Sequence, residues 1–173
     1  MNSSTRTLYR LEGGVDNKAL REILEEANRT PSMAALAPWA LVVIEPPYPD
    51  VVFEDAVETV TPLEVPVSRI VGGAGVMVAV LGEKNRPGAL EAAWGVVSVI
   101  CASAHSHGIE SVVFNPGNEA AVLDLFKSPS WYRLAGIVAL GKPGEALGTY
   151  QAKPLDTCVI VHKRGDNHPL PPA

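Results

Sequence analysis

The chain has 173 residues, of which 47% are hydrophobic and 19% are charged, and its formal net charge at pH 7 is −5. This length fits one domain, and the apolar fraction supports a buried core and excludes an intrinsically disordered chain. The negative charge argues against a nucleic-acid-binding protein, because such a protein needs a basic surface to neutralise phosphates.

The first elements along the chain are a predicted helix and a predicted strand. Apolar residues recur at helical spacing within Val15–Arg29, Asp16 is placed to cap this helix, and Pro31 stops it. The nearly continuous apolar run Trp39–Glu45 predicts a strand that is covered on both faces. Residues 46–66 are acidic and rich in proline, so they form either a surface connection or a mobile lid over a pocket.

A glycine cluster at Gly72, Gly73 and Gly75 separates the next two predicted elements. A short helical turn is expected within Val65–Ala74, and the apolar run Val76–Gly82 predicts a second buried strand. A dinucleotide-binding loop follows its strand and opens a helix, whereas this cluster precedes its strand. We therefore interpret the cluster as a helix-to-strand turn.

The longest predicted helix, Ala89–His107, is apolar almost all round and ends at Gly108. Residues 92–106 carry no formal charge, but they are too few and include too many small polar residues for a membrane span. A helix without a polar face must be covered on every side, which places it at the centre of the domain or in a dimer interface. In the second case, an aspartate at Val97 or Ile100 is expected to disrupt the dimer.

The last third of the chain predicts three more strands and one helix. The strands are expected at Ser111–Phe114, Leu134–Gly141 and Thr157–His162, and Asn118 is placed to cap a helix over Glu119–Lys127. The alternation of helices and buried strands predicts one layered α/β unit without repeats. We expect a single domain over residues 1–165, followed by a loose, flexible C-terminal tail over residues 166–173.

Neither a metal site nor an activated nucleophile is indicated. His105 and His107 would point about 200° apart on a helix, so they cannot bind a metal together, and we predict no metal site. Cys101 and Cys158 lie in apolar surroundings and are interpreted as buried, reduced thiols. Without an evident base beside any hydroxyl or thiol, the chemistry of an enzyme would belong to a cofactor. The N-terminus has no apolar stretch typical of a signal peptide, which favours a cytoplasmic protein.

The segment between the first helix and the first apolar strand carries a family signature. Its sequence, TPSMAALAPW, begins at Thr30 and places Pro31-Ser32 and Pro38-Trp39 at a characteristic spacing. This spacing is that of the A-P-S-S-x-N-x-Q-P-W loop of nitroreductase-like flavoenzymes, and the chain resembles that family here.

Other segments extend the resemblance over nearly the whole chain. The basic segment Arg6–Leu11 stands in the place of the family's N-terminal R-x-S-x-R-x-F pattern. The central helix is followed by Gly108–Glu110 where the family has Gly-Leu-Gly. Gly141–Glu145 is similar to the family's G-x-P-x-E turn after its penultimate strand, and Lys153–Asp156 is similar to a late R/K-x-P-L-D/E element.

The resemblance implies an α+β fold, a three-layer α/β/α sandwich with a central mixed β-sheet and a buried central helix. It also implies an intertwined homodimer that binds FMN at the subunit interface. By position, three cations would hold the FMN phosphate: Arg6, Arg10 and Lys153.

The same resemblance assigns residues to the flavin ring. Pro31, Ser32 and Met33 would lie beside the isoalloxazine, and the strand from Ser111 would offer backbone donors near its reactive nitrogen. Two amide side chains of the family's loop, however, are replaced here by Ala35 and Ala37, and each lost hydrogen bond costs about 1 kcal/mol.

Two main functions therefore remain open, and a third, weaker one is the binding of another anionic small molecule in the same cleft. The first is an FMN-dependent oxidoreductase that passes electrons from NAD(P)H through the flavin to a small organic acceptor, without nucleic-acid or membrane partners. The second is a degenerate homodimer of the same fold that binds no flavin and acts as a binding or structural protein. Met33, Ala35 and Ala37 motivate the second function, because they replace polar residues of the loop.

Overall fold

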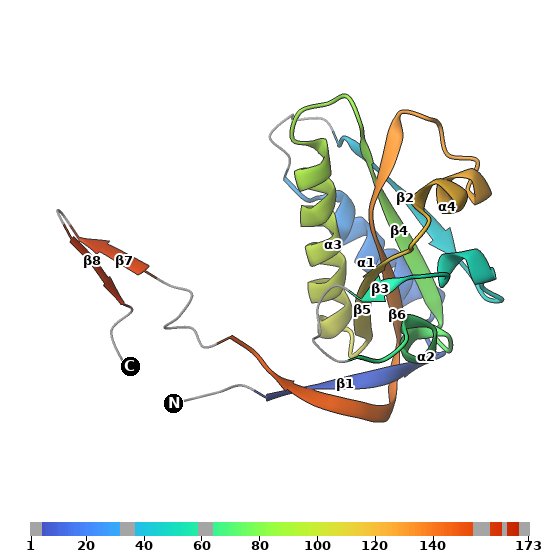
Figure 1. The fold of residues 1–173 in the computed structure, drawn as a ribbon, viewed down its shortest axis with the longest axis horizontal. Helices are drawn as coiled ribbons and strands as arrows, with labels where there is room; N and C mark the ends of the chain where they lie inside the picture. The colour runs from blue at the N-terminus through green and yellow to red at the C-terminus, as the bar shows by residue number, and fades with distance from the viewer. Residues whose placement is uncertain (1–4, 32–36, 59–63, 154–159, 164–165, 170–173) are drawn as a thin grey trace.

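The computed structural model describes residues 5–31, 37–58, 64–153, 160–163 and 166–169. Its body is an antiparallel sheet with the strand order β2-β4-β6-β5-β3, and β1 pairs with the far half of β6 (Figure 1). In chain order the elements are β1 Thr5–Glu12, α1 Asn17–Asn28, β2 Trp39–Ile44, a 3₁₀ turn Asp50–Val52, β3 Val57–Glu58, α2 Val67–Val71, β4 Val76–Glu83, α3 Ala89–Ser106, β5 Glu110–Asn115, α4 Glu119–Leu125, β6 Tyr132–Gln151, β7 Ile160–Lys163 and β8 Asp166–Pro169.

Strand β4 shows why the domain has three layers. Successive side chains of a strand point to opposite faces, so an uncharged, apolar strand can serve two cores at once. Val76, Val78 and Val80 join the cluster formed with α1 and α3. Met77 and Leu81 join the cluster formed with α2 and α4 on the other face. The expected α+β sandwich with a buried strand here is confirmed.

Both predicted side-chain caps are present. The Asp16 carboxylate accepts a hydrogen bond from the Ala19 backbone N–H at 2.8 Å, and the Asn118 carboxamide oxygen accepts one from Ala121 at 3.0 Å. Each cap satisfies a backbone donor that the first helical turn leaves without an internal partner. The glycine cluster forms the expected helix-to-strand turn, since α2 ends at Val71 and β4 begins at Val76.

The long helix α3 is confirmed, but its apolar surface is divided between two environments. Val97 and Ile100 face the chain's own sheet and are 3% and 0% exposed. The opposite side of α3, which includes Ser98 and Ala102, is exposed. The expectation that an aspartate at Val97 or Ile100 reports on a dimer is therefore wrong, because either change would disrupt the subunit's own core. Of the described helices, α3 is the one long and apolar enough to cross a membrane, yet its inner face packs on the sheet.

Strand β6 departs most from expectation. The segment Gly141–Glu145 was expected to form a turn, but β6 continues through it as a single strand of 20 residues. Its first half lies between β4 and β5, and its second half leaves the sheet and pairs with β1 from Glu12↔Lys142 to Thr5↔Gln151. At the crossing, a Cβ on Gly141 would lie 2.8 Å from the Glu12 carbonyl oxygen, so only glycine fits there.

The edge strand β2 and the C-terminal segment of the chain also differ from expectation. Strand β2 is an edge strand with Val43 40% exposed, rather than a strand covered on both faces. Strand β8 occupies residues 166–169, where a loose tail was expected, and pairs with β7 in a hairpin that stands apart from the body in Figure 1. The first residues of the strand predicted at Thr157–His162 lie outside the described residues, as does Cys158.

We predict that Ile100→Ala lowers the free energy of unfolding by about 2–5 kcal/mol, because it leaves a cavity between α3 and the sheet. Ser98→Ala, two residues away on the exposed side, is expected to change it by less than about 0.5 kcal/mol. Urea unfolding followed by circular dichroism measures both values. Equal effects of the two substitutions would contradict the assignment of the inner face.

Candidate functional site

A large cavity lies where the β1–β6 ribbon passes the C-terminal half of α3. Its volume is about 830 Å³, within the range of small-molecule sites. The walls come from three places: β1 with the far end of β6, one side of α3, and residues 110–113 of β5. The lining residues are Arg6, Thr7, Leu8, Tyr9, Leu11, Cys101, Ala102, His105, Glu110, Ser111, Val112, Val113 and Tyr150.

Backbone geometry brings these residues together. Arg6 and Tyr150 are directly opposite one another in the β1–β6 ladder. Cys101 and His105 lie one turn apart on α3, so they face the same side of the helix. Ser111 lies on β5 with the side chain near Cys101.

The cavity contains one arginine and mixed polar groups. Arg6 is exposed and forms no ion pair with any residue that the structure describes. Tyr9, Tyr150 and Ser111 add hydroxyl groups, and Glu110 adds a carboxylate. Such a set suits a ligand with one anionic group and several hydroxyls.

The surroundings of Cys101 do not activate its thiol as a nucleophile. Burial raises the pKa of its thiol, and a hydrogen bond with Ser111 only partly opposes that effect. A reactive cysteine needs a lowered pKa, because the thiolate is the nucleophile. The sequence predicts a buried, reduced thiol here; Cys101 is a free thiol, but it is only partly buried.

The structure separates the cations that the sequence groups together. Arg6 lines the cavity, whereas Arg10 is not among the lining residues and lies 3.9 Å from Glu12 in an exposed ion pair. Lys153 is exposed and follows Gln151, which pairs with Thr5, so it lies near the same end of the ribbon as Arg6.

Pro31 lies at a different part of α3 from Arg6. Its neighbour Thr30 packs beside Gly95, with the Thr30 Cγ2 atom 3.5 Å from the position of a Cβ on that glycine. The cavity instead contacts α3 at Cys101–His105, about 9–15 Å further along the helix at ~1.5 Å per residue. Ser32, Met33 and Ala35 lie outside the described residues, whereas Ala37 is described and exposed.

Sequence reasoning missed Tyr9, Tyr150, Cys101 and His105 as lining residues. The spacing of Cys101 and His105 by one helical turn was a usable signal, since it places them on one face. Tyr9 and Tyr150 had no such signal, because the N-terminal segment was not recognised as a strand and the half of β6 that pairs with it lies about 130–146 residues away in the chain.

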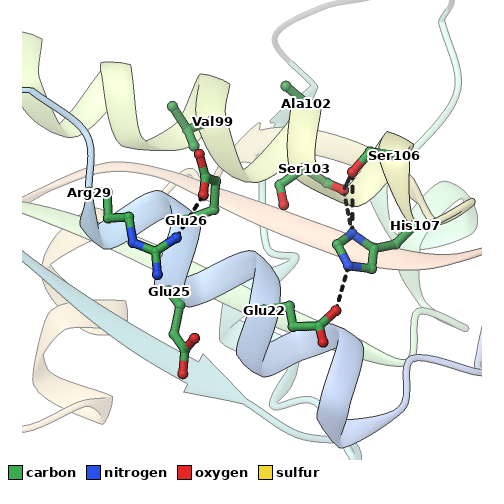
Figure 2. Close-up of a pocket in the computed structure, with 9 residues that line it drawn as sticks. All are labelled: Glu22, Glu25, Glu26, Arg29, Val99, Ala102, Ser103, Ser106 and His107. Atoms are coloured by element: carbon green, nitrogen blue, oxygen red, sulfur yellow. Dashed lines mark hydrogen bonds and ion pairs between the residues drawn. The ribbon is translucent and has the colours of Figure 1, made fainter.

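A second hollow, of about 590 Å³, lies between α1 and α3 on the surface (Figure 2). In it, His107 Nε2 lies 2.9 Å from a Glu22 carboxylate oxygen, and Ser106 Oγ lies 3.3 Å from His107 Nδ1. This order of groups resembles a serine–histidine–carboxylate triad. However, Nδ1 is closer to the Ser103 carbonyl, at 2.8 Å, and the Ser106 hydroxyl donates to that same carbonyl at 2.7 Å. Nδ1 therefore carries a hydrogen and cannot act as a base toward Ser106.

No group of three or more histidine, cysteine, aspartate or glutamate side chains within the described ranges is arranged to hold a metal ion. His105 faces the large cavity, and His107 faces the α1–α3 hollow. The two rings thus contact different parts of the protein.

The sequence as a whole matches one protein-family model. The match covers residues 3–142 and is described as the nitroreductase family. The chain belongs to the nitroreductase family. The matched region includes β1, α3, β5 and the part of β6 inside the main sheet. The walls of the cavity up to residue 142 therefore lie within it. No curated protein sequence matches the chain.

Solved structures of nitroreductase-family proteins share the fold. A protein from Desulfovibrio desulfuricans in complex with FMN has a TM-score of 0.72 and 22% identity, with 91% of this chain and 92% of that chain covered. An FMN-dependent nitroreductase from Clostridium difficile R20291 has a TM-score of 0.67 and 18% identity, with 84% and 87% covered. Iodotyrosine deiodinase bound to FMN and 3-iodo-L-tyrosine has a TM-score of 0.67 and 21% identity, with 91% and 93% covered.

The contact between α1 and α3 predicts a pH-dependent stability. Hydrogen bonds to the Ser103 carbonyl and the Glu22 carboxylate raise the pKa of His107 above its ordinary value of 6.5. The protonated ring is thus favoured in the folded state. Its contribution to stability is complete below the unfolded pKa and is lost as the pH rises through the folded pKa.

We predict that His107→Gln lowers the urea midpoint at about pH 5.5 and has little effect at about pH 9. Unfolding curves at several pH values measure this difference between the variant and the wild type. Glu22→Gln should reduce the same pH dependence, while Glu91→Gln, exposed on the outer side of α3, should not. A difference that grows with pH would show that the neutral ring is the favoured form.

Proposed function

We propose that this nitroreductase-family protein is an FMN-dependent oxidoreductase that transfers electrons from NAD(P)H to a small organic acceptor. The observation that supports this most is the cavity at Arg6: an arginine without an ion-pair partner among the described residues opens onto a space of about 830 Å³. The FMN of the structural relatives named above supports the choice of ligand.

The residues of the cavity fit FMN. Arg6 supplies a charge-assisted donor for the phosphate, and Lys153 follows the adjacent end of the ribbon. Arg10 is the weakest member of the proposed phosphate set, because it does not line the cavity and it pairs with Glu12 at 3.9 Å. The hydroxyls of Tyr9 and Tyr150 suit the ribityl chain, and apolar wall residues suit the ring.

One copy of the chain supplies only part of the proposed site. The cavity lined by Arg6 meets α3 at Cys101–His105, about 9–15 Å along the helix at ~1.5 Å per residue from Gly95, where Thr30 packs just before Pro31. If Pro31, Ser32 and Met33 lie beside the isoalloxazine, a second copy must bring them to the cavity. We therefore propose a homodimer in which each site combines the ribbon of one subunit with the loop of its partner.

The outer face of α3 suits such a dimer. Ser98 and Ala102 are exposed there and have small, uncharged side chains, while the charged Glu91 lies two turns before Ser98. Small side chains let two helices approach closely. Burial of this face would also exclude water from the neighbouring cavity.

The bound flavin would supply the capacity to accept a hydride and release electrons, and the chain would position and shield it. Arg6 and Lys153 hold the phosphate, while the apolar walls keep water from the ring. Donors fixed before the reaction stabilise negative charge better than mobile water does. We propose the cytoplasm as the location of this soluble family member.

The alternative is a dimer that binds no flavin. Its motivation is the loss of amide side chains at Ala35 and Ala37. The visible spectrum of the purified protein after gel filtration separates the two functions. A flavin band that stays with the protein supports the oxidoreductase, whereas colourless protein that does not take up added FMN supports the alternative.

We predict that Arg6→Ala and Lys153→Ala each weaken FMN binding by about 10- to 100-fold, because each removes a charged partner of the phosphate. Fluorescence titration of the flavin-stripped protein measures the dissociation constant. Arg21→Ala is the matched control, since Arg21 is exposed on α1 and pairs with Glu25. Unchanged binding in Arg6→Ala would show that this cavity does not bind the phosphate of FMN.

We also predict that Ser98→Asp converts the dimer to monomer, because it places charge in an interface that excludes water. Light scattering after gel filtration measures the mass. Ser68→Asp introduces the same charge on exposed α2 and should leave the dimer intact. A Ser98→Asp variant that remains dimeric would exclude this face of α3 from the interface.

A further inference from the structure

A surface hollow of about 360 Å³ lies at the end of the main sheet away from the β1–β6 ribbon. It forms where the loop between β4 and α3 meets the loop between α4 and β6 (Figure 1). Its volume is within the range of small-molecule sites. The lining residues are Glu83, Asn85, Arg86, Pro87 and Trp131.

The hollow is separate from the cavity that we assign to the flavin, and the two share no lining residue. Glu83 pairs with Tyr132 at the start of β6, whereas the ribbon with β1 begins ten residues later, at Lys142. Along α3, the hollow precedes Ala89, and the flavin cavity contacts the helix from Cys101 onward. These 12 residues span about 18 Å at ~1.5 Å per residue. A ligand in the hollow would therefore occupy a second site.

Trp131 supplies an exposed aromatic surface on a fixed backbone. It is 57% exposed. Its carbonyl accepts a hydrogen bond from the Lys84 N–H at 2.7 Å, which joins the two loops. The neighbouring Tyr132 donates its N–H to the Pro129 carbonyl at 3.0 Å, and its ring centroid lies 6.4 Å from that of the indole. Because the backbone is held before a ligand binds, less entropy is lost when a ring stacks on the indole.

Arg86 brings an oriented guanidinium to the same hollow. Its side chain is 35% exposed, and its Nε donates to a Glu83 carboxylate oxygen at 2.7 Å. This bond uses one of the five guanidinium N–H groups and orients the others. An arginine oriented in this way can bind a phosphate through two parallel hydrogen bonds.

The surrounding loops are basic, although the chain as a whole is acidic. Residues 84–88 and 127–133 contain four cationic side chains and no carboxylate, in a chain with a formal net charge of −5. Besides Arg86, the cations are exposed and form no ion pair with any described residue: Lys84, Lys127 and Arg133. The carboxylate of Glu83 is offset by Arg86. This local excess of positive charge favours an anionic ligand.

We propose that this hollow binds a nucleotide, with the base stacked on Trp131 and a phosphate bound by Arg86 and Lys84. Any base suits the indole, because every base has a flat π face. A lining of five residues suits one small molecule, since a stable protein interface needs about 20–30 residues a side. The site goes beyond the proposed function, because it exists whether or not the protein binds flavin. A free nucleotide and the adenosine half of NAD(P)H share this chemistry, and the experiments distinguish them.

Isothermal titration calorimetry with ADP tests the site in the purified protein. ADP should bind saturably, whereas adenosine and inorganic phosphate, which each offer part of the contacts, should bind at least about 10-fold more weakly. Arg86→Gln and Lys84→Glu should each raise the dissociation constant of ADP by about 10-fold or more, because each removes a charged partner of the phosphate. Arg21→Gln is the matched control, since Arg21 is exposed on α1 and pairs with Glu25.

The aromatic contact has its own variants. Trp131→Leu should raise the same dissociation constant by about 5-fold or more, and Trp131→Phe, which keeps an aromatic ring, should recover most of the loss. Trp94→Leu, which alters a partly exposed tryptophan on α3, should leave ADP binding unchanged. Urea midpoints check that each variant folds. The site would be overturned if the wild type did not bind ADP, if Trp131→Leu and Lys84→Glu both bound it normally, or if a polyglutamate peptide bound in its place.

Two measurements separate this site from the proposed flavin site and identify the source of the nucleotide. Arg6→Ala should leave ADP binding unchanged, and a loss would place ADP in the flavin cavity and overturn the proposal. In the flavin-loaded protein, a rise in KM for NADPH in Arg86→Gln would identify the nucleotide as part of the electron donor, whereas an unchanged KM would identify a free nucleotide. If the wild type proves colourless, the oxidoreductase function fails, but calorimetry with ADP still decides whether the hollow is a nucleotide site.

Discussion

The structure depends on one continuous strand that serves two partners in turn. Over its first half β6 lies between β4 and β5 and forms the centre of the main sheet. Over its second half it pairs with β1 and forms the outer wall of the cavity. The change of partner occurs at Gly141, where the β1 backbone comes too close for any side chain. Core packing and the shape of the cavity are therefore fixed by the same strand.

Local patterns were sufficient to predict the elements with local causes. The caps at Asp16 and Asn118 involve residues three apart, and the two-sided strand β4 is apolar at every core position. The ribbon was not predictable in this way. Its pairs join β1 to residues about 130–146 positions away, and no local signal sets that register. The G-x-P-x-E segment also resembled a turn, because its sequence favours one where no partner strand competes.

The candidate site shows the same division between features that the sequence predicts and features that depend on long-range pairing. The family resemblance assigned Arg6 and the strand from Ser111 to one flavin site, and both residues line the same cavity. It could not separate Arg6 from Arg10, because that depends on register irregularities in β1 after Leu8 and Tyr9. Nor could it reveal that Val97 and Ile100 point inward while Ser98 points outward. An almost uniformly apolar helix gives no periodic contrast from which to read its faces.

The region shared with the family ends at residue 142, just where β6 leaves the main sheet. The rest of β6, including Tyr150, lies beyond the matched residues. A fragment truncated there would keep both hydrophobic layers and yet leave β1 without its neighbour and Arg6 without an opposing wall. The half of β6 that pairs with β1 therefore completes the wall opposite Arg6, which itself lies within the matched region.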